Sequence, residues 1–91
     1  MQVFWTDHAL QDLERLHAFL AKANAEAAAH VLQSLVVAPA NLLTYSRMGP
    51  MLEKYEPREV RRLIVGSYEM HYELKVNSLH ILRVWHTREN R

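Results

Sequence analysis

The chain has 91 residues, of which 49% are hydrophobic and 23% charged, and its net charge at neutral pH is +1. This balance describes one folded domain, residues 1–91, and excludes a disordered chain or a strongly basic DNA-binding domain. The absence of cysteine excludes disulfides, thiolate nucleophiles and cysteine-based zinc sites.

The amino-terminal stretch MQVFWTDHAL lacks the basic start and apolar run of a signal peptide. No apolar run approaches the roughly 20 residues that are needed to cross a bilayer. A chain without cysteine also suits a reducing compartment. We therefore expect a soluble, cytoplasmic protein with no membrane partner.

The first half of the chain predicts a strand followed by two helices. Residues 2–5, QVFW, are strand formers, and Thr6 and Asp7 after them are good N-cap residue types. An apolar stripe then predicts an amphipathic helix over residues 7–22, at Ala9, Leu13, Leu16 and Leu20. Asn24 can cap a second helix, and so short a connection predicts an antiparallel helical hairpin.

Pro39 must interrupt the second helix, because it lacks a backbone donor and clashes with the preceding turn. The sequence PANLLTY then predicts a short helical continuation, which the MGP of residues 48–50 ends. Residues 51–58 are expected to form an extended connector, since Pro57 excludes a helix there.

The last third of the chain predicts a three-stranded meander over residues 58–65, 68–75 and 79–86. The middle strand alternates between an apolar face (Tyr68, Met70, Tyr72, Leu74) and a polar face (Glu69, His71, Glu73, Lys75). The order β-α-α-β-β-β predicts an α+β domain, with the helical hairpin packed on one face of a mostly antiparallel sheet.

Most catalytic signatures are absent from the sequence. It has no HExxH helix, no triad pattern and no phosphate-cradling glycine loop, since it contains two glycines in all. The six histidines are scattered, so we expect neither a metal site nor a cofactor. His71 and His80 lie on neighbouring strands and could pair, although two solvent-facing residues are the favoured interpretation.

Positive charge gathers towards the C-terminus. Residues 1–57 carry four Lys/Arg against six Asp/Glu, a net of −2, whereas residues 58–91 carry seven against four, a net of +3. Two interpretations stay open: a solvated strand end that resists edge aggregation, or cations that meet phosphates or assist proton transfer. The cluster comprises Arg61 and Arg62, on opposite faces of the first meander strand, then Arg83, His86, Arg88 and Arg91.

Four segments in order carry a family resemblance: FWTDHALQDLERLHAFL, RMGP, REVRRLIVGSYEMHYEL and HILRVWHTRENR. They resemble the RelE/ParE superfamily, the toxin halves of bacterial type II toxin–antitoxin modules, over nearly the whole chain. The resemblance implies the β-α-α-β-β-β fold that the residues predict. It also implies a cognate antitoxin, a toxin–antitoxin hetero-oligomer, growth arrest and plasmid stabilisation.

The superfamily holds two activities: RelE-like members cut mRNA on the ribosome, and ParE-like members poison DNA gyrase. The RNA-cleaving members usually place an arginine directly after the tyrosine that opens the second meander strand. Here that tyrosine is Tyr68 and Glu69 follows it, so a carboxylate would repel the scissile phosphate. The resemblance therefore favours a gyrase poison with no catalytic residues of its own.

For a gyrase poison, the expected residues that contact gyrase and its DNA are Arg61, Arg62, Trp85, His86, Arg88 and Arg91. The alternative is an RNA endonuclease, for which the looser matches are Arg62, His86 and Arg88. A third interpretation is a relative that binds antitoxin but has lost toxicity.

Overall fold

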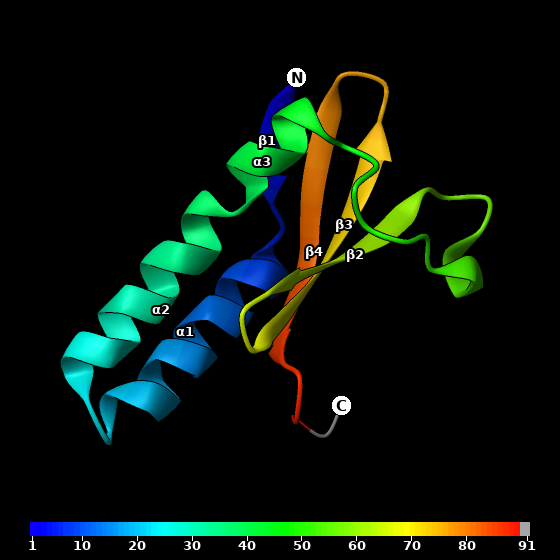
Figure 1. Cartoon of the computed structure of the whole chain (residues 1–91). Helices are drawn as coiled ribbons and strands as arrows, with labels where there is room; N and C mark the ends of the chain where they lie inside the picture. The colour runs from blue at the N-terminus through cyan, green and yellow to red at the C-terminus, as the bar shows by residue number, and fades with distance from the viewer. Residues whose placement is uncertain (90–91) are drawn as a thin grey trace.

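The computed structural model describes residues 1–89. Its elements follow the predicted order β-α-α-β-β-β, with a third short helix and a 3₁₀ turn between the hairpin and the meander (Figure 1). In chain order they are β1 (Gln2–Trp5), α1 (Asp7–Ala21), α2 (Ala25–Val37), α3 (Pro39–Thr44), the 3₁₀ turn η1 (Glu53–Tyr55), β2 (Val60–Val65), β3 (Tyr68–Lys75) and β4 (Ser78–His86).

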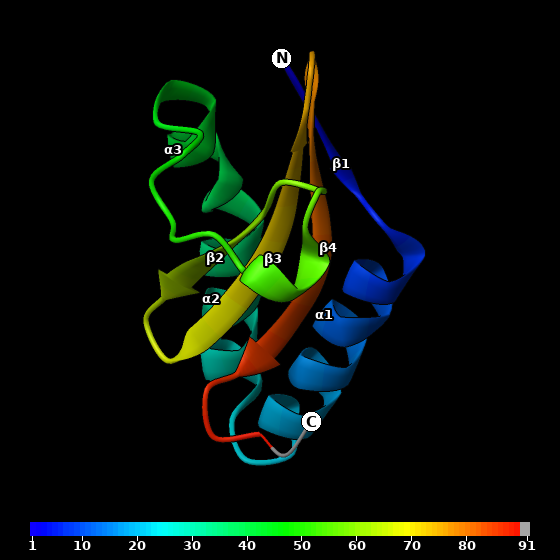
Figure 2. The same cartoon turned by 90° about the vertical axis from the view of Figure 1, so that its right-hand side faces the viewer.

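The four strands form one sheet in the order β1-β4-β3-β2. β1 runs parallel to β4, and the other two pairings are antiparallel, so the predicted mostly antiparallel sheet is confirmed. Helices α1 and α2 lie against one face, which we call the helix face, while the connector that carries η1 lies on the other side (Figures 1 and 2). We call that other side the outer face.

Both helices begin where their capping residues predict. The Thr6 side chain accepts a hydrogen bond from the Ala9 amide, and the Asn24 side chain accepts one from the Ala27 amide. Each cap satisfies an amide that the first helical turn would otherwise leave unpaired. The predicted apolar stripes then enter the core on the helix face, where the central residues are Leu13, Leu16, Leu35, Leu42, Met70, Tyr72, Ile81 and Val84.

Ala38 separates α2 from α3, and Pro39 is the first residue of α3, as predicted. The expectation that no apolar run approaches 20 residues is wrong, because Ala25–Thr44 is long and apolar enough by length and composition to cross a membrane. The many alanines of this segment raise its mean hydropathy although their side chains are small. In the fold this segment is a broken helix pair whose Leu35 and Leu42 are buried in the core.

The connector before the meander is only partly extended. Met51 forms an isolated antiparallel bridge with Arg61, and the chain then turns through η1 before β2 begins at Val60. The Leu52 amide donates to the Val60 carbonyl, and the Arg62 amide donates to the Pro50 carbonyl. The connector therefore covers the first half of the β2 edge, which sequence periodicity could not show.

The polar face of β3 is buried, which corrects its predicted exposure. Glu69, His71 and Glu73 are all buried, because β3 is a central strand and long side chains from its neighbours cover its outer face. His71 pairs in register with Arg83, and Glu73 pairs with His80. The two histidines therefore do not form a cross-strand pair.

Side chains of the α1 segment cover the edge of β4 beyond the end of β1. The Thr6 hydroxyl donates to the Leu82 carbonyl over 3.0 Å, and the Val84 amide donates to the Asp12 carboxylate over 2.9 Å. Arg15 donates to the Val84 carbonyl over 3.3 Å. This edge is thereby closed to strand addition at Leu82 and Val84.

Candidate functional site

The sheet register sorts the predicted site residues by face. Ile64, Glu69 and Trp85 share one rung of the outer face, and Arg62 shares the next rung with His71 and Arg83. His86 pairs instead with Tyr68 on the helix face, where the two rings meet edge to face at 5.2 Å. Trp85 and His86 thus lie on opposite faces, as successive strand residues must.

Arg61 and Arg62 also point to opposite faces, as predicted, and they differ in what they contact. The Arg61 side chain is largely buried, and it donates to Glu59 over 2.9 Å and to the Gly49 carbonyl over 2.7 Å. It therefore holds the connector in place. Arg62 is exposed and makes no side-chain hydrogen bond or ion pair within residues 1–89.

Trp85 is packed on the outer face between two supports. Its ring meets the His71 ring edge to face at 4.6 Å, and the Arg83 guanidinium lies 4.8 Å from its centroid. His71 in turn forms a 2.6 Å contact with Glu69. We define the outer-face patch as Arg62 and Ile64 on β2 together with Trp85 on β4, which flank Glu69 and His71 of β3 on the same face of the sheet.

A second feature lies where the end of α1 meets the C-terminal turn. A cavity of about 500 Å³ opens there, and we call it the wedge; its lining is Arg15, Leu16, Phe19, Leu20, His86, Arg88 and Glu89. Glu89 ties its two sides together by accepting from Arg15 over 3.0 Å and from the His86 amide over 3.0 Å. Phe19 is 70% exposed, so the wedge presents apolar surface to solvent.

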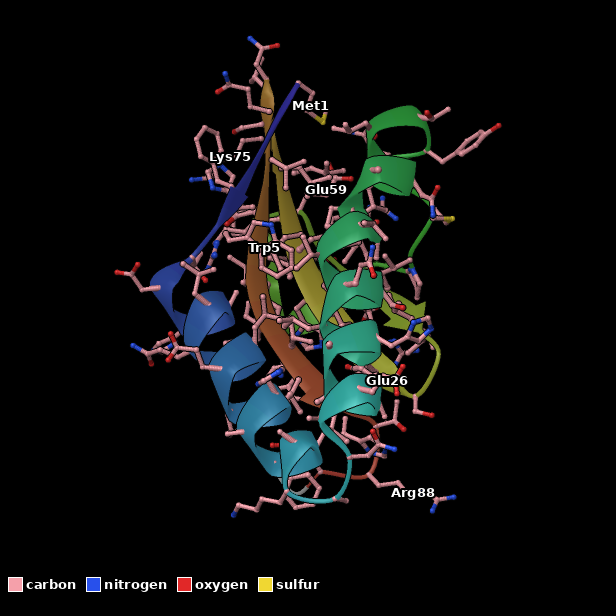
Figure 3. All side chains as sticks on the ribbon, turned by 90° about the vertical axis from the view of Figure 1, so that its left-hand side faces the viewer. Met1, Trp5, Glu26, Glu59, Lys75 and Arg88 are labelled. Atoms are coloured by element: carbon pink, nitrogen blue, oxygen red, sulfur yellow. The ribbon has the colours of Figure 1, made fainter. Side chains whose placement is uncertain are left out.

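Arg88 stands at the rim of this wedge. Its amide donates to Nδ1 of His86 over 3.1 Å, while its guanidinium makes no ion pair within residues 1–89. Figure 3 shows its side chain at the lower end of the molecule, directed away from the helices. Arg91, the last predicted member of the set, lies outside the described residues.

Of the residues of the RNase alternative, His86 and Arg88 come together at the wedge, whereas Arg62 lies apart from them on the outer face. Arg62 is on the outer face and His86 on the helix face, so the two cannot flank one phosphate without rearrangement of the sheet. Glu69 is buried against His71. Within residues 1–89, no group of three His, Asp or Glu side chains could hold a metal ion.

Comparison with known families identifies the family of this chain. The model of the ParE toxin of the type II toxin–antitoxin system parDE matches residues 3–91. The chain belongs to the ParE toxin family. The resemblance inferred from the sequence is thereby confirmed, and this ParE-type toxin is one half of a type II toxin–antitoxin system.

A solved structure of the chromosomal ParDE toxin–antitoxin system from P. aeruginosa is similar to this ParE-family chain. The TM-score is 0.78 at 22% identity, over 94% of this chain and 95% of that chain. That likeness confirms the predicted fold. No curated protein matches the chain.

Sequence reasoning missed the residues that support the outer-face patch, chiefly Asp12. Asp12 as a whole is 4% exposed, and its carboxylate accepts from Arg83, Arg15 and the Val84 amide. A signal for it exists in the sequence, since Asp12 follows Ala9 by three residues and precedes Leu16 by four. An acidic residue on the apolar stripe of an amphipathic helix needs a buried partner.

Two carboxylates, Glu73 of β3 and Glu59 directly before β2, make the stability of the fold depend on pH. The pKa of Glu73 is lowered chiefly by its hydrogen bonds with Arg58, and that of Glu59 chiefly by its hydrogen bond with Arg47. A carboxyl whose folded pKa lies below its unfolded value of about 4.5 adds stability above that pH. That stability is lost as the pH falls through the folded pKa.

We predict that the stability of Glu73→Gln falls less steeply with decreasing pH than that of the native protein. Between about pH 5 and about pH 3 the urea midpoint of the native protein falls, and in the variant it falls less, because one carboxylate with a lowered pKa is gone. Urea titrations followed by circular dichroism measure both slopes. Glu14→Gln, on an exposed position of α1, is the control and keeps the native slope; identical slopes for Glu73→Gln would contradict the prediction.

Proposed function

We propose that this ParE-family toxin acts in the cytoplasm on DNA gyrase and its DNA, and that a cognate antitoxin neutralises it. The observation that supports a binding role over a catalytic one is which arginine side chains already have hydrogen-bond or ion-pair partners. Among the arginines of β2 and β4, only Arg62 has no side-chain partner within residues 1–89. Arg62 and Ile64 on β2 and Trp85 on β4 flank the buried Glu69–His71 pair of β3, so the patch offers a cation and an aromatic anchor on a rigid base.

Such a patch suits contact with an anionic macromolecular surface. Tryptophan and arginine dominate the energetics of protein interfaces, and unpaired surface cations raise the rate of association with polyanions. Arg61, Arg58 and Arg83 contribute less to such a field, because each already bonds to a carboxylate. We therefore assign target contact first to Arg62 and Trp85, with Arg88 at the neighbouring end of the sheet.

The deciding test is an in vitro assay with gyrase, ATP and supercoiled plasmid. We expect protein-linked cleaved DNA that depends on this chain and disappears when the antitoxin is added. Growth arrest without an effect on gyrase would contradict the proposal and direct attention to ribosome-bound mRNA. A chain that binds antitoxin but never arrests growth would be the non-toxic relative.

We further propose that an apolar segment of the antitoxin fills the wedge. Exposed apolar surface next to a cation that makes no ion pair within residues 1–89 fits a partner segment that combines apolar and acidic side chains. Occupation of the wedge would cover Phe19 and place an acidic residue near Arg88. An antitoxin segment in the wedge would therefore lie beside His86, the residue that follows Trp85 of the outer-face patch.

We predict that Phe19→Ala weakens antitoxin binding about 30-fold, as expected when an interface aromatic worth about 2 kcal/mol is truncated. Isothermal titration calorimetry or biolayer interferometry with purified antitoxin measures the change. Val76→Ala is the matched control, because Val76 is 92% exposed and follows Lys75, at the end of the molecule opposite Arg88 (Figure 3). Equal affinities for the native chain and Phe19→Ala would show that the antitoxin does not occupy the wedge.

A further inference from the structure

A buried carboxylate on α1 is connected to the tryptophan on the far side of the sheet. Asp12 lies in the interface between α1 and β4, and Trp85 lies on the outer face. Arg83 joins them: its Nε donates to one Asp12 oxygen over 2.8 Å, and its Nη2 donates to the other over 3.2 Å. The same guanidinium lies 4.8 Å from the centroid of the Trp85 ring.

An irregularity in β4 makes this connection possible. The β3–β4 register changes from His71 beside Arg83 to Tyr72 beside Ile81, so that Leu82 is an extra residue in β4. A β-bulge of this kind bends its strand and redirects the following side chains. Because β1 ends at Trp5, the bulged part of β4 lies beside α1, and the Arg83 guanidinium reaches Asp12 there.

Asp12 fixes both the guanidinium and the strand that carries the tryptophan. One of its oxygens accepts from Arg83 and also from the Val84 amide over 2.9 Å, directly before Trp85 in the chain. Arg15, the neighbour of Asp12 by one helical turn, adds a further bond at 3.1 Å. The Asp12 hydrogen bonds also raise the pKa of the Arg83 guanidinium, which therefore stays charged over the accessible pH range.

We propose that Asp12 and Arg83 are positioning residues for Trp85: they hold its indole in the orientation that the outer-face patch presents to the target. A planar guanidinium fixed by two hydrogen bonds is a better support than a mobile one, because a preorganised interface side chain loses less entropy on binding. His71 supports the ring from β3. The functional part of this inference rests on the proposed role of Trp85, whereas the structural part does not.

Asp12→Asn tests the inference with the least damage to the fold. Asparagine keeps an oxygen for the Val84 amide but loses the charge and one of the acceptors of Arg83. The ¹H–¹⁵N spectrum of the full chain contains two indole signals, assigned with Trp85→Phe and Trp5→Phe. We expect the Trp85 indole signal to shift or broaden in Asp12→Asn and in Arg83→Ala. The Trp5 signal should stay in place and reports that the fold is intact.

The gyrase assay adds the functional readout. We expect Asp12→Asn to raise the toxin concentration for half-maximal cleavage about tenfold, and to add no further loss in a Trp85→Ala background, because coupled residues are not additive. Glu14→Gln, on the exposed side of the same helix, should match the native chain in both assays. A native Trp85 signal in Asp12→Asn, or additive losses in the double variant, would overturn the positioning role. Absence of gyrase cleavage by the native chain would instead refute the proposed function and leave the indole result to decide this inference.

Discussion

Gly49→Ala is expected to lower the free energy of unfolding by about 3 kcal/mol, the upper end of the usual cost of overpacking. A Cβ at this position would lie 2.0 Å from the Arg62 carbonyl oxygen and 2.8 Å from the carbonyl carbon. Both atoms are backbone in β2, so no side-chain rotation relieves the clash. The Gly49 amide also donates to the Tyr72 hydroxyl over 3.2 Å, and its carbonyl accepts from Arg61.

Urea unfolding followed by circular dichroism measures this loss, and the second glycine supplies a matched control. Gly66 has a φ of +60°, but a Cβ added there would meet no atom within 4 Å. Gly66→Ala should therefore cost only about 1 kcal/mol, the penalty of the left-handed conformation alone. If both variants lose the same amount, close approach of the connector to β2 is not what requires glycine at position 49. The connector would then be free to move away from the edge of the sheet.

Local signals explain why so much of the fold could be predicted from the sequence. The caps Thr6 and Asn24, the break at Pro39 and the helical spacing of the leucines each act within a few residues, and the structure has them where they were expected. Strand alternation also predicted the two faces of β3 correctly. What alternation cannot reveal is whether a polar face meets solvent, and in β3 it does not, because β3 lies inside the sheet.

The candidate site was only partly predictable, for a related reason. The sequence locates the cations but not their partners, which are distant along the chain: Arg83 bonds to Asp12, and Arg61 bonds to Gly49. The structure therefore reduces a cluster defined by sequence proximity to the few arginines that have no side-chain partner within residues 1–89, Arg62 and Arg88. The bulge at Leu82 and the closure of the β4 edge by α1 depend on tertiary contacts and have no signature in strand periodicity.

The largest functional effect is expected on the outer face. Trp85→Ala should raise the toxin concentration for half-maximal gyrase cleavage about 100-fold, since truncation of a central interface tryptophan commonly costs about 3 kcal/mol. Arg62→Glu should slow association by about tenfold or more, with an effect that shrinks as salt is added. Neither substitution touches the wedge, so antitoxin affinity should change less than about threefold in both variants, within the range of energetically neutral positions.

Arg47→Ala is the matched control for charge, because Arg47 is also exposed but already paired with Glu59. It should leave gyrase cleavage near the native level. The opposite pattern would be equally informative: full cleavage by Trp85→Ala and Arg62→Glu, with loss of cleavage when Arg88 and Arg91 are both replaced by alanine, would move target contact to the C-terminal tail. Because the sheet places Trp85 and His86 on opposite faces and Arg88 lines the wedge beside His86, a loss of cleavage caused by replacement of Arg88 would assign the target to the other side of the strand.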